Sequence, residues 1–167
     1  MTEAITFEQA IALTQNLLTQ LVSETEIQAT ITTLVSTENG ARGFFVTYLT
    51  ADRPYADQPS DAVIKALQTS PAIVSELLVK NLAMSASMAI AHRRTANEAM
   101  AQGSDRVQRR TTILIQRVQM PEVLQKAAQL QASAETGVGE YQTFLERWGY
   151  DAEQQQKIAQ VMRAICE

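Results

Sequence analysis

Residues 70–102 read SPAIVSELLVKNLAMSASMAIAHRRTANEAMAQ, with no proline after the second position and no glycine. Serine is a favoured helix cap and proline is tolerated in the first helical turn, so Ser70-Pro71 predicts a helix start. Gly103 offers the stop, before a restart at Asp105. A helix of this length spans roughly 45 Å, about the diameter expected of a globule of this size. It is therefore predicted to cross the molecule centrally.

Apolar residues of this segment gather in one sector of a helical wheel, which we expect to face the core. That sector holds Ile73, Val74, Leu77, Leu78, Met84, Met88 and Ala89. The opposite, solvent-facing side is predicted to hold Glu76, Lys80, Ser87, Arg94 and Glu98. Asn81, Ser85 and His92 share the apolar sector, so the core face is expected to carry a polar stripe, with His92 largely buried.

Two interpretations of the Asn81–Ser85–His92 stripe stay open. Buried polar groups are normally hydrogen-bonded, which here means to neighbouring helices, to buried water or across a homodimer seam. Alternatively, the stripe forms the wall of a ligand pocket, with His92 as a hydrogen-bond donor or as the axial ligand of a tetrapyrrole such as haem. The second interpretation predicts a small-ligand or tetrapyrrole-binding bundle.

Further amphipathic segments predict helices along the rest of the chain. Capping-box spacing opens three of them, at Thr6, Ser23 and Asp151. We expect helices from Thr6, from Ser23 to Asn39-Gly40, over 41–50, 60–69 and 105–119, from Pro121 to Gly137, and a hairpin turning at Gly149. The strand-like runs Phe44–Leu49 and Thr111–Ile115 have no partner strands. The prediction is an all-α, single-domain bundle of six to eight helices over residues 1–167.

Composition is that of a globular protein, with 46% hydrophobic and 19% charged residues in 167. The apolar stretch 83–91 is far shorter than the ~20 residues that cross a bilayer, so we expect no membrane segment. No signal-peptide pattern follows Met1. One cysteine, Cys166, cannot form an internal disulfide. We therefore expect a cytoplasmic protein.

Charge is divided along the chain, although the net charge is −4. Residues 1–62 hold two basic and eight acidic side chains, residues 63–118 hold eight and three, and residues 119–167 hold four and seven. Six of the ten arginines lie between Arg93 and Arg117. The last four of these, Arg106, Arg109, Arg110 and Arg117, are predicted to form a ladder on one helix. This ladder either pairs with the acidic ends of the chain or binds an acidic protein partner. Nucleic acid is not expected, because no aromatic residues interleave with the arginines to stack bases.

The sequence lacks the residues or motifs that several kinds of metal, nucleotide and catalytic site require. One histidine cannot supply a ferritin-like pair of Glu-x-x-His motifs, and histidine with cysteine cannot build a zinc site. Phosphate-loop, dinucleotide-binding and nucleophile-elbow motifs are also missing from the sequence. We expect no metal, no cofactor and no catalytic machinery.

Two phrases resemble those of uncharacterised all-helical proteins of cyanobacteria. They are TENGARGFF at 37–45 and LAMSASM at 82–88. The resemblance covers the middle of the chain and implies no activity. The predicted function is non-catalytic protein–protein interaction or regulation, in a homo-oligomer.

Overall fold

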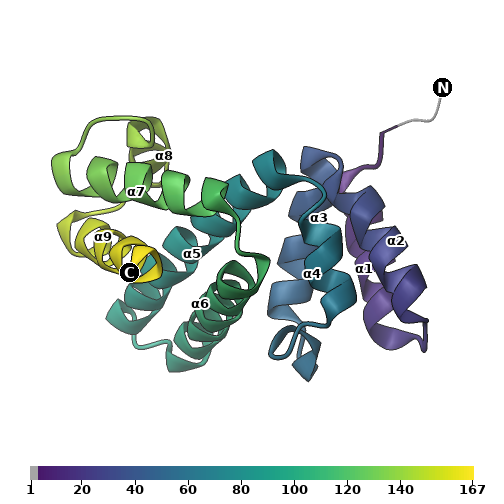
Figure 1. The fold of residues 1–167 in the computed structure, drawn as a ribbon. Coiled ribbons are helices and arrows are strands. Elements are labelled where there is room, and N and C mark those ends of the chain that lie inside the picture. Colours follow the sequence, from purple (N-terminus) through teal and green to yellow (C-terminus); the bar gives the residue numbers. More distant parts are fainter. Residues whose placement is uncertain (1–3) are drawn as a thin grey trace. The chain divides into compact units, whose positions relative to one another are not determined.

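The computed structural model describes residues 4–167, and all regular structure in that range is helical (Figure 1). The elements are α1 (Phe7–Thr19), α2 (Glu24–Val35), α3 (Glu38–Thr50), the 3₁₀ turn η1 (Pro54–Ala56), α4 (Asp61–Leu67), α5 (Pro71–Arg94), α6 (Glu98–Val118), α7 (Pro121–Thr136), α8 (Gln142–Trp148) and α9 (Ala152–Cys166). The all-α class is confirmed. The described range holds nine α-helices, one more than the upper end of the expected number.

The described chain separates into two compact units, divided within α5 between Leu77 and Leu78. The first unit contains α1 to α4 and the start of α5. The second contains the rest of α5 and α6 to α9. Each unit is described by itself, and the single domain predicted over residues 1–167 stays a prediction.

The first unit is built by α1 packing on α3, and by α2 packing on α3 and α4. Thr6 and Gln9 form the predicted capping box at the start of α1. Gly43 lets α1 approach α3, because a Cβ atom there would lie 2.5 Å from the Cβ of Ala10. The next residue, Phe44, stacks on Tyr48 one turn further along α3, with ring centroids 5.0 Å apart. The aromatic run that resembled a strand is therefore the core face of α3.

The second helix ends earlier than the sequence predicts. α2 stops at Val35, and the side chain of Thr37 caps α3 by accepting a hydrogen bond from the Gly40 amide. Gly40 consequently lies in the first turn of α3 and does not end α2. A Cβ atom at this position would lie 2.1 Å from the carbonyl oxygen of Leu34. The glycine serves close approach of the backbone here, not a left-handed turn.

In the second unit α7 packs on α9, α6 also contacts α9, and α8 contacts α7 (Figure 1). Its apolar core includes Leu114, Val123, Leu130, Leu145, Ile158 and Met162, all buried. Asp151 and Gln154 form the predicted capping box of α9. Gly137 and Gly149 adopt left-handed conformations that end α7 and α8, as expected of glycine at helix ends.

The break in the long central segment lies eight residues before the predicted one. α5 ends at Arg94, and α6 runs through Gly103 without interruption. Ala96 takes a left-handed φ of 57°, and the side chain of Asn97 caps α6 by accepting from the Met100 amide. The carbonyl of His92 accepts the amides of Thr95 and Asn97, which closes the turn. A non-glycine residue seldom adopts this conformation, so the sequence does not predict that the helix ends here.

The buried face of α5 is also rotated from the predicted one. Its buried residues are Val74, Ser75, Leu78, Val79, Leu82, Ala83, Ser85, Ala86, Ser87 and Ala89. Met88, predicted in the core, is 40% exposed, and Ser87, predicted to face solvent, is fully buried. Small residues allow neighbouring helices to approach α5, and this outweighs the higher hydrophobicity of methionine.

Length and composition alone would allow α5 to cross a membrane, and no other helix of residues 4–167 passes that test. The sequence-based expectation of no membrane segment stays a prediction. Of the apolar window, 56% is buried inside the protein. The same test is passed by core helices of soluble proteins, so this property does not show a membrane span.

Candidate functional site

A groove of about 1250 Å³ runs through the second unit. One wall is made by α5 and α6, and the other by the end of α7 and by α9. Four buried alanines form its floor, namely Ala86, Ala89, Ala134 and Ala159, and the half-buried Ile90 and the exposed Ala152 add further apolar lining. Its rim holds polar and charged residues, among them Arg93, Asp105, Gln108, Glu135, Gln156, Lys157, Gln160 and Arg163. The groove is thus a polar-edged trough with an alanine-rich base.

Helical periodicity places these residues on the groove. Along α9, Ala152, Gln156, Ala159 and Arg163 are spaced four, three and four residues apart, which keeps them on one face. The α5 residues of the groove also share one helix face, since they are three, one and three residues apart; they are Ala86, Ala89, Ile90 and Arg93. Alanine at the base leaves room for another backbone to approach both helices. The glutamines at the rim offer both hydrogen-bond donors and acceptors.

Arg93 joins the end of α5 to the start of α6. Its guanidinium donates to both carboxylate oxygens of Asp105, at 3.3 and 2.7 Å, and to Glu98 at 3.1 Å. Hydrogen bonds to Asp105 and then to Glu98 raise the pKa of Arg93. All three side chains are exposed by about half, so this cluster contributes more to geometry than to stability. It braces the turn between the helices beside the groove.

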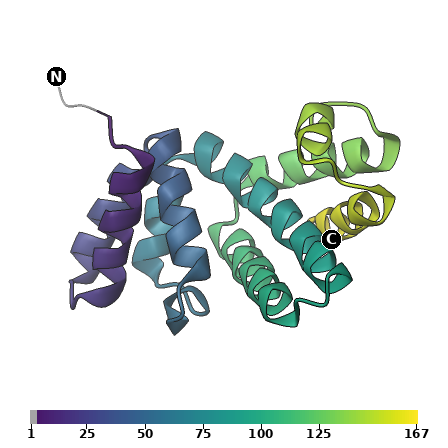
Figure 2. The same cartoon turned by 180° about the vertical axis from the view of Figure 1, so that it is seen from behind.

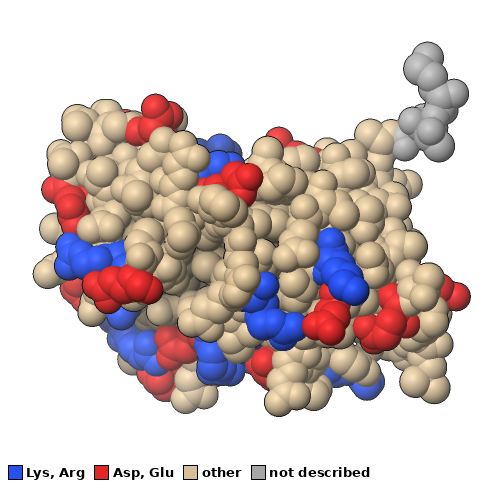
Figure 3. All heavy atoms as spheres, viewed as in Figure 1, with Lys and Arg blue, Asp and Glu red and all other residues tan. Residues whose placement is uncertain are grey.

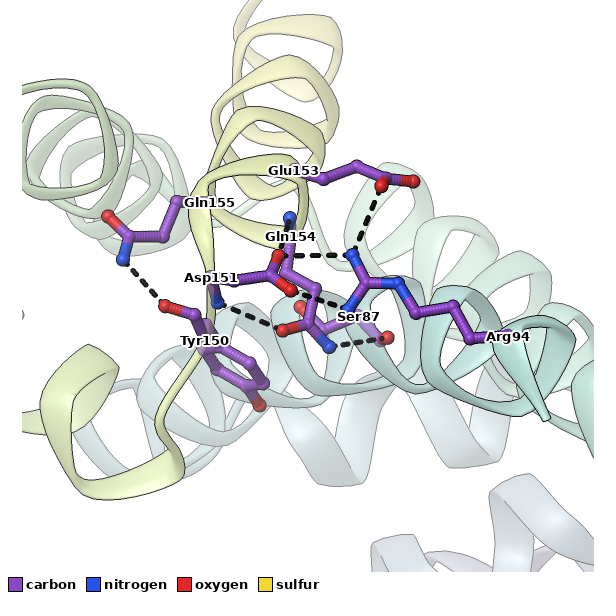
Figure 4. A network of polar contacts seen from close by, with 7 residues as sticks. All are labelled: Ser87, Arg94, Tyr150, Asp151, Glu153, Gln154 and Gln155. Atoms are coloured by element: carbon purple, nitrogen blue, oxygen red, sulfur yellow. Dashed lines mark hydrogen bonds and ion pairs between the residues drawn. The ribbon is translucent and has the colours of Figure 1, made fainter.

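Arg94 makes an equivalent contact to the start of α9 (Figure 4). Its guanidinium donates to both oxygens of Asp151 and, at 3.1 Å, to Glu153. The hydrogen bond from Arg94 holds the pKa of Asp151 below its usual range, and the amide of Gln154 adds to the effect. Asp151 therefore has two roles, since it also caps α9. This pair links a residue of the basic segment with the acidic C-terminal segment, as the charge distribution suggested for the arginines.

A third ion pair crosses from α9 to α7, where Arg163 donates to Glu135 at 2.7 Å. Gln131 also donates to Glu135, at 3.0 Å, and these two hydrogen bonds lower the pKa of the Glu135 carboxyl, that of Gln131 having the larger effect. Basic and acidic side chains alternate over the second unit in the space-filling view (Figure 3). On that face the charges are mixed, and no large patch of one sign is present.

A small polar cluster lies under the contact between α5 and α9 (Figure 4). Gln154 is buried and donates at 3.2 Å to the carbonyl of Ser87. The Ser87 hydroxyl is buried without a hydrogen-bond partner. Burial raises the pKa of the neighbouring Tyr150 phenol to about 12, and the nearby Ser87 hydroxyl opposes that shift. Both hydroxyls are protonated at neutral pH, so the cluster is structural in character.

The predicted stripe does not line this groove. Ser85 is buried and its hydroxyl donates to the Leu82 carbonyl of the same helix, so it needs no partner helix. Asn81 and His92 are only half-buried. His92 is therefore less buried than the core residues of α5, and the physical reason is that the most tightly packed face of α5 is rotated from the predicted one. Among residues 4–167, no group of three or more His, Cys, Asp or Glu side chains could hold a metal.

The predicted arginine ladder is divided by burial. Arg110 is 2% exposed and lies on the core side of α6, Arg106 is half-buried, and Arg109 and Arg117 are exposed. Because the four arginines differ so much in burial, they do not form one exposed surface that an acidic partner could contact. Arg93 and Arg94, which the sequence analysis did not select, make the ion pairs around the groove.

The lone thiol, Cys166, lies at the end of α9 outside the groove lining, and partial burial raises its pKa, which disfavours the reactive thiolate. The groove can bind through hydrogen bonds, ion pairs and close backbone packing.

These features define a small all-helical protein with an open, polar-edged groove. The chain belongs to the family described as uncharacterised conserved protein UCP020893, whose model matches residues 6–165. No curated protein and no solved structure matches the chain. The cyanobacterial resemblance is not tested by the family match and stays a prediction.

Proposed function

We propose that this protein is a non-catalytic interaction module, and that the groove of the second unit receives a helical segment of a protein partner. The observation that carries the proposal is the groove itself, with alanines at its base and polar side chains at its rim. A helix about ten residues long, roughly 15 Å by 10 Å, occupies about 1200 Å³. That volume matches the groove.

The rim favours a protein segment over a small apolar ligand. Ligand pockets are typically enclosed and lined by hydrophobic and aromatic side chains, with few polar groups. This groove is open and carries no aromatic residue among its lining residues. Its charges already form ion pairs with one another, so a partner with exposed amides and mixed charges meets little desolvation cost. We propose a cytoplasmic location for the interaction.

Site-specific photocrosslinking in the native organism tests the proposal. A photoreactive residue at Gln160, on the rim, should give one discrete protein adduct, whereas the same residue at Gln102, exposed on α6 away from the lining, should give none. Ala152→Trp fills the groove from an exposed position and should abolish the adduct. Ala164→Trp, exposed on the same helix but outside the lining, is the matched control and should leave it. Equal adducts from Gln160 and Gln102 would refute the groove as the binding site.

The tetrapyrrole alternative is tested separately by the absorption spectrum of protein purified from its own organism. A visible band that disappears in His92→Ala would support it. The arrangement of Asn81, Ser85 and His92 supplies no second ligating group, so we expect no such band.

A further inference from the structure

One face of α5 in the second unit lies opposite the groove. It holds Asn81, Met84, Met88, Ala91 and His92, which fall within an arc of about 100° on a helical wheel. Met88 is 40% exposed, and the other four residues are half-buried. Seen from behind, no helix of this unit lies between α5 and the viewer (Figure 2). We call these five residues the α5 seam.

Side-chain contacts from α5 to other helices of the second unit come from residues outside the α5 seam. Arg93 binds α6, Arg94 and the Ser87 carbonyl bind α9, and Lys80 lies 5.5 Å from the ring centroid of Phe144 on α8. Among the described residues, no side chain of the α5 seam makes a hydrogen bond, an ion pair or a ring contact. The seam is therefore a face of a core helix that its own unit leaves without polar partners.

Sequence spacing on this face fits helix–helix pairing. Asn81, Met84, Met88 and Ala91 follow one another at three, four and three residues, the heptad spacing of a coiled-coil seam. Asn81 then occupies an a position, where a single asparagine helps to set register and oligomeric state. The seam carries no formal charge, because the four charged residues of α5, namely Glu76, Lys80, Arg93 and Arg94, all fall outside the arc.

We propose that the α5 seam is a homodimer interface, in which α5 packs against α5 of a second copy across a two-fold axis. A two-fold interface places the same surface on both subunits, so a face must be complementary to itself. A protein of net charge −4 meets its own copy most favourably through an uncharged face. Asn81 and His92 each offer a donor and an acceptor, which lets them hydrogen-bond across the seam.

The two α5 helices run antiparallel. A parallel arrangement would place Arg93 and Arg94 beside the same residues of the second copy and would align the helix dipoles unfavourably. Antiparallel packing about Met84 instead brings Asn81 of each copy near Met88 of the other. The seam spans only about three helical turns, so the dimer is small and its population depends on protein concentration.

Sedimentation equilibrium over a thousand-fold concentration range tests this inference. The wild-type protein should change from monomer to dimer with rising concentration. Met88→Glu, which places a charge in the uncharged seam near Asn81 of the other copy, should weaken dimerisation at least tenfold while circular dichroism stays helical. Met100→Glu, at a 54% exposed methionine on α6, is the matched control and should dimerise as the wild type does.

A second variant locates the axis. Met84→Cys in a Cys166→Ser background should form an interchain disulfide on oxidation, and Ala164→Cys in the same background should not. If Met88→Glu loses its helical signal, Asn81→Lys replaces it with the same expected result. A wild-type protein that stays monomeric throughout, or a dimer that survives Met88→Glu and dissociates in high salt, would overturn the proposal.

Discussion

The packing of α1 on α3 makes a strong prediction at Gly43. Replacing a helical glycine by alanine normally stabilises a protein by about 0.5–1 kcal/mol, because alanine has the higher helix propensity. At Gly43 the added Cβ atom would lie 2.5 Å from the Cβ of Ala10 and 2.8 Å from the carbonyl oxygen of Phe7. The second contact is to backbone, so α1 itself must move. Overpacking of this kind costs about 1–3 kcal/mol or more, which exceeds the gain.

Gly103 provides the control within the same chain. It also lies inside a helix, but a Cβ atom there meets no other atom within 4 Å. We expect Gly103→Ala to raise the melting temperature, and Gly43→Ala to lower it by about 2–8 °C, since about 1 kcal/mol corresponds to about 2–4 °C at this size. Urea denaturation and calorimetry of the three proteins measure both effects. If Gly43→Ala stabilises as much as Gly103→Ala, the close approach of α1 and α3 is wrong.

Three further predictions concern the second unit. Ser87→Ala should stabilise the fold by about 1 kcal/mol, because it removes a buried hydroxyl that has no hydrogen-bond partner. Ser85→Ala should not stabilise it, because the Ser85 hydroxyl is hydrogen-bonded, and urea denaturation measures the difference between the two variants. Arg110→Gln should lower the free energy of unfolding by at least ~1.5 kcal/mol, because a buried guanidinium makes hydrogen bonds that the substitution removes. Arg109→Gln, at an exposed position, should change the free energy of unfolding little. Equal effects of the two substitutions would contradict the burial of Arg110. Arg94→Gln should raise the pKa of Asp151, followed by NMR titration of its carboxyl carbon. Because the folded pKa of Asp151 is lowered, the stability that Arg94 adds is present at neutral pH and is lost as the pH falls through that pKa, so wild type and variant should converge in acid.

Local signals in the sequence predicted the helices well, because a helix cap is decided by residues three positions apart. The boxes at Thr6 and Asp151 and the start of α5 at Pro71 are as expected. The end of α5 was missed because Ala96 adopts a left-handed conformation that only its surroundings stabilise. Gly103, which looked like the stop, has the conformation of any helical residue.

The site was harder to predict than the fold. A helical wheel weighted by hydrophobicity placed Met88 inside and Ser87 outside, whereas close packing between helices selects small side chains. The charge distribution indicated that basic residues would find acidic partners in the C-terminal segment. It could not identify Arg94 and Asp151, which are 57 positions apart and meet only in the folded unit.

The left-handed conformation of Ala96 affects how α5 and α6 can be arranged, within one molecule or between two. If Ala96 and Asn97 both took right-handed helical angles, α5 and α6 would join into a single rod from Pro71 to Val118, roughly 72 Å long. The hairpin would open, and α6 of one molecule could take its place in another, which is domain swapping. The left-handed angles of Ala96 cost about 1 kcal/mol and so destabilise the α5–α6 hairpin. The contacts of Arg93 with Asp105 and Glu98 stabilise the hairpin and offset this cost. Ala96→Gly would relieve it, which would favour the closed hairpin over an exchanged assembly.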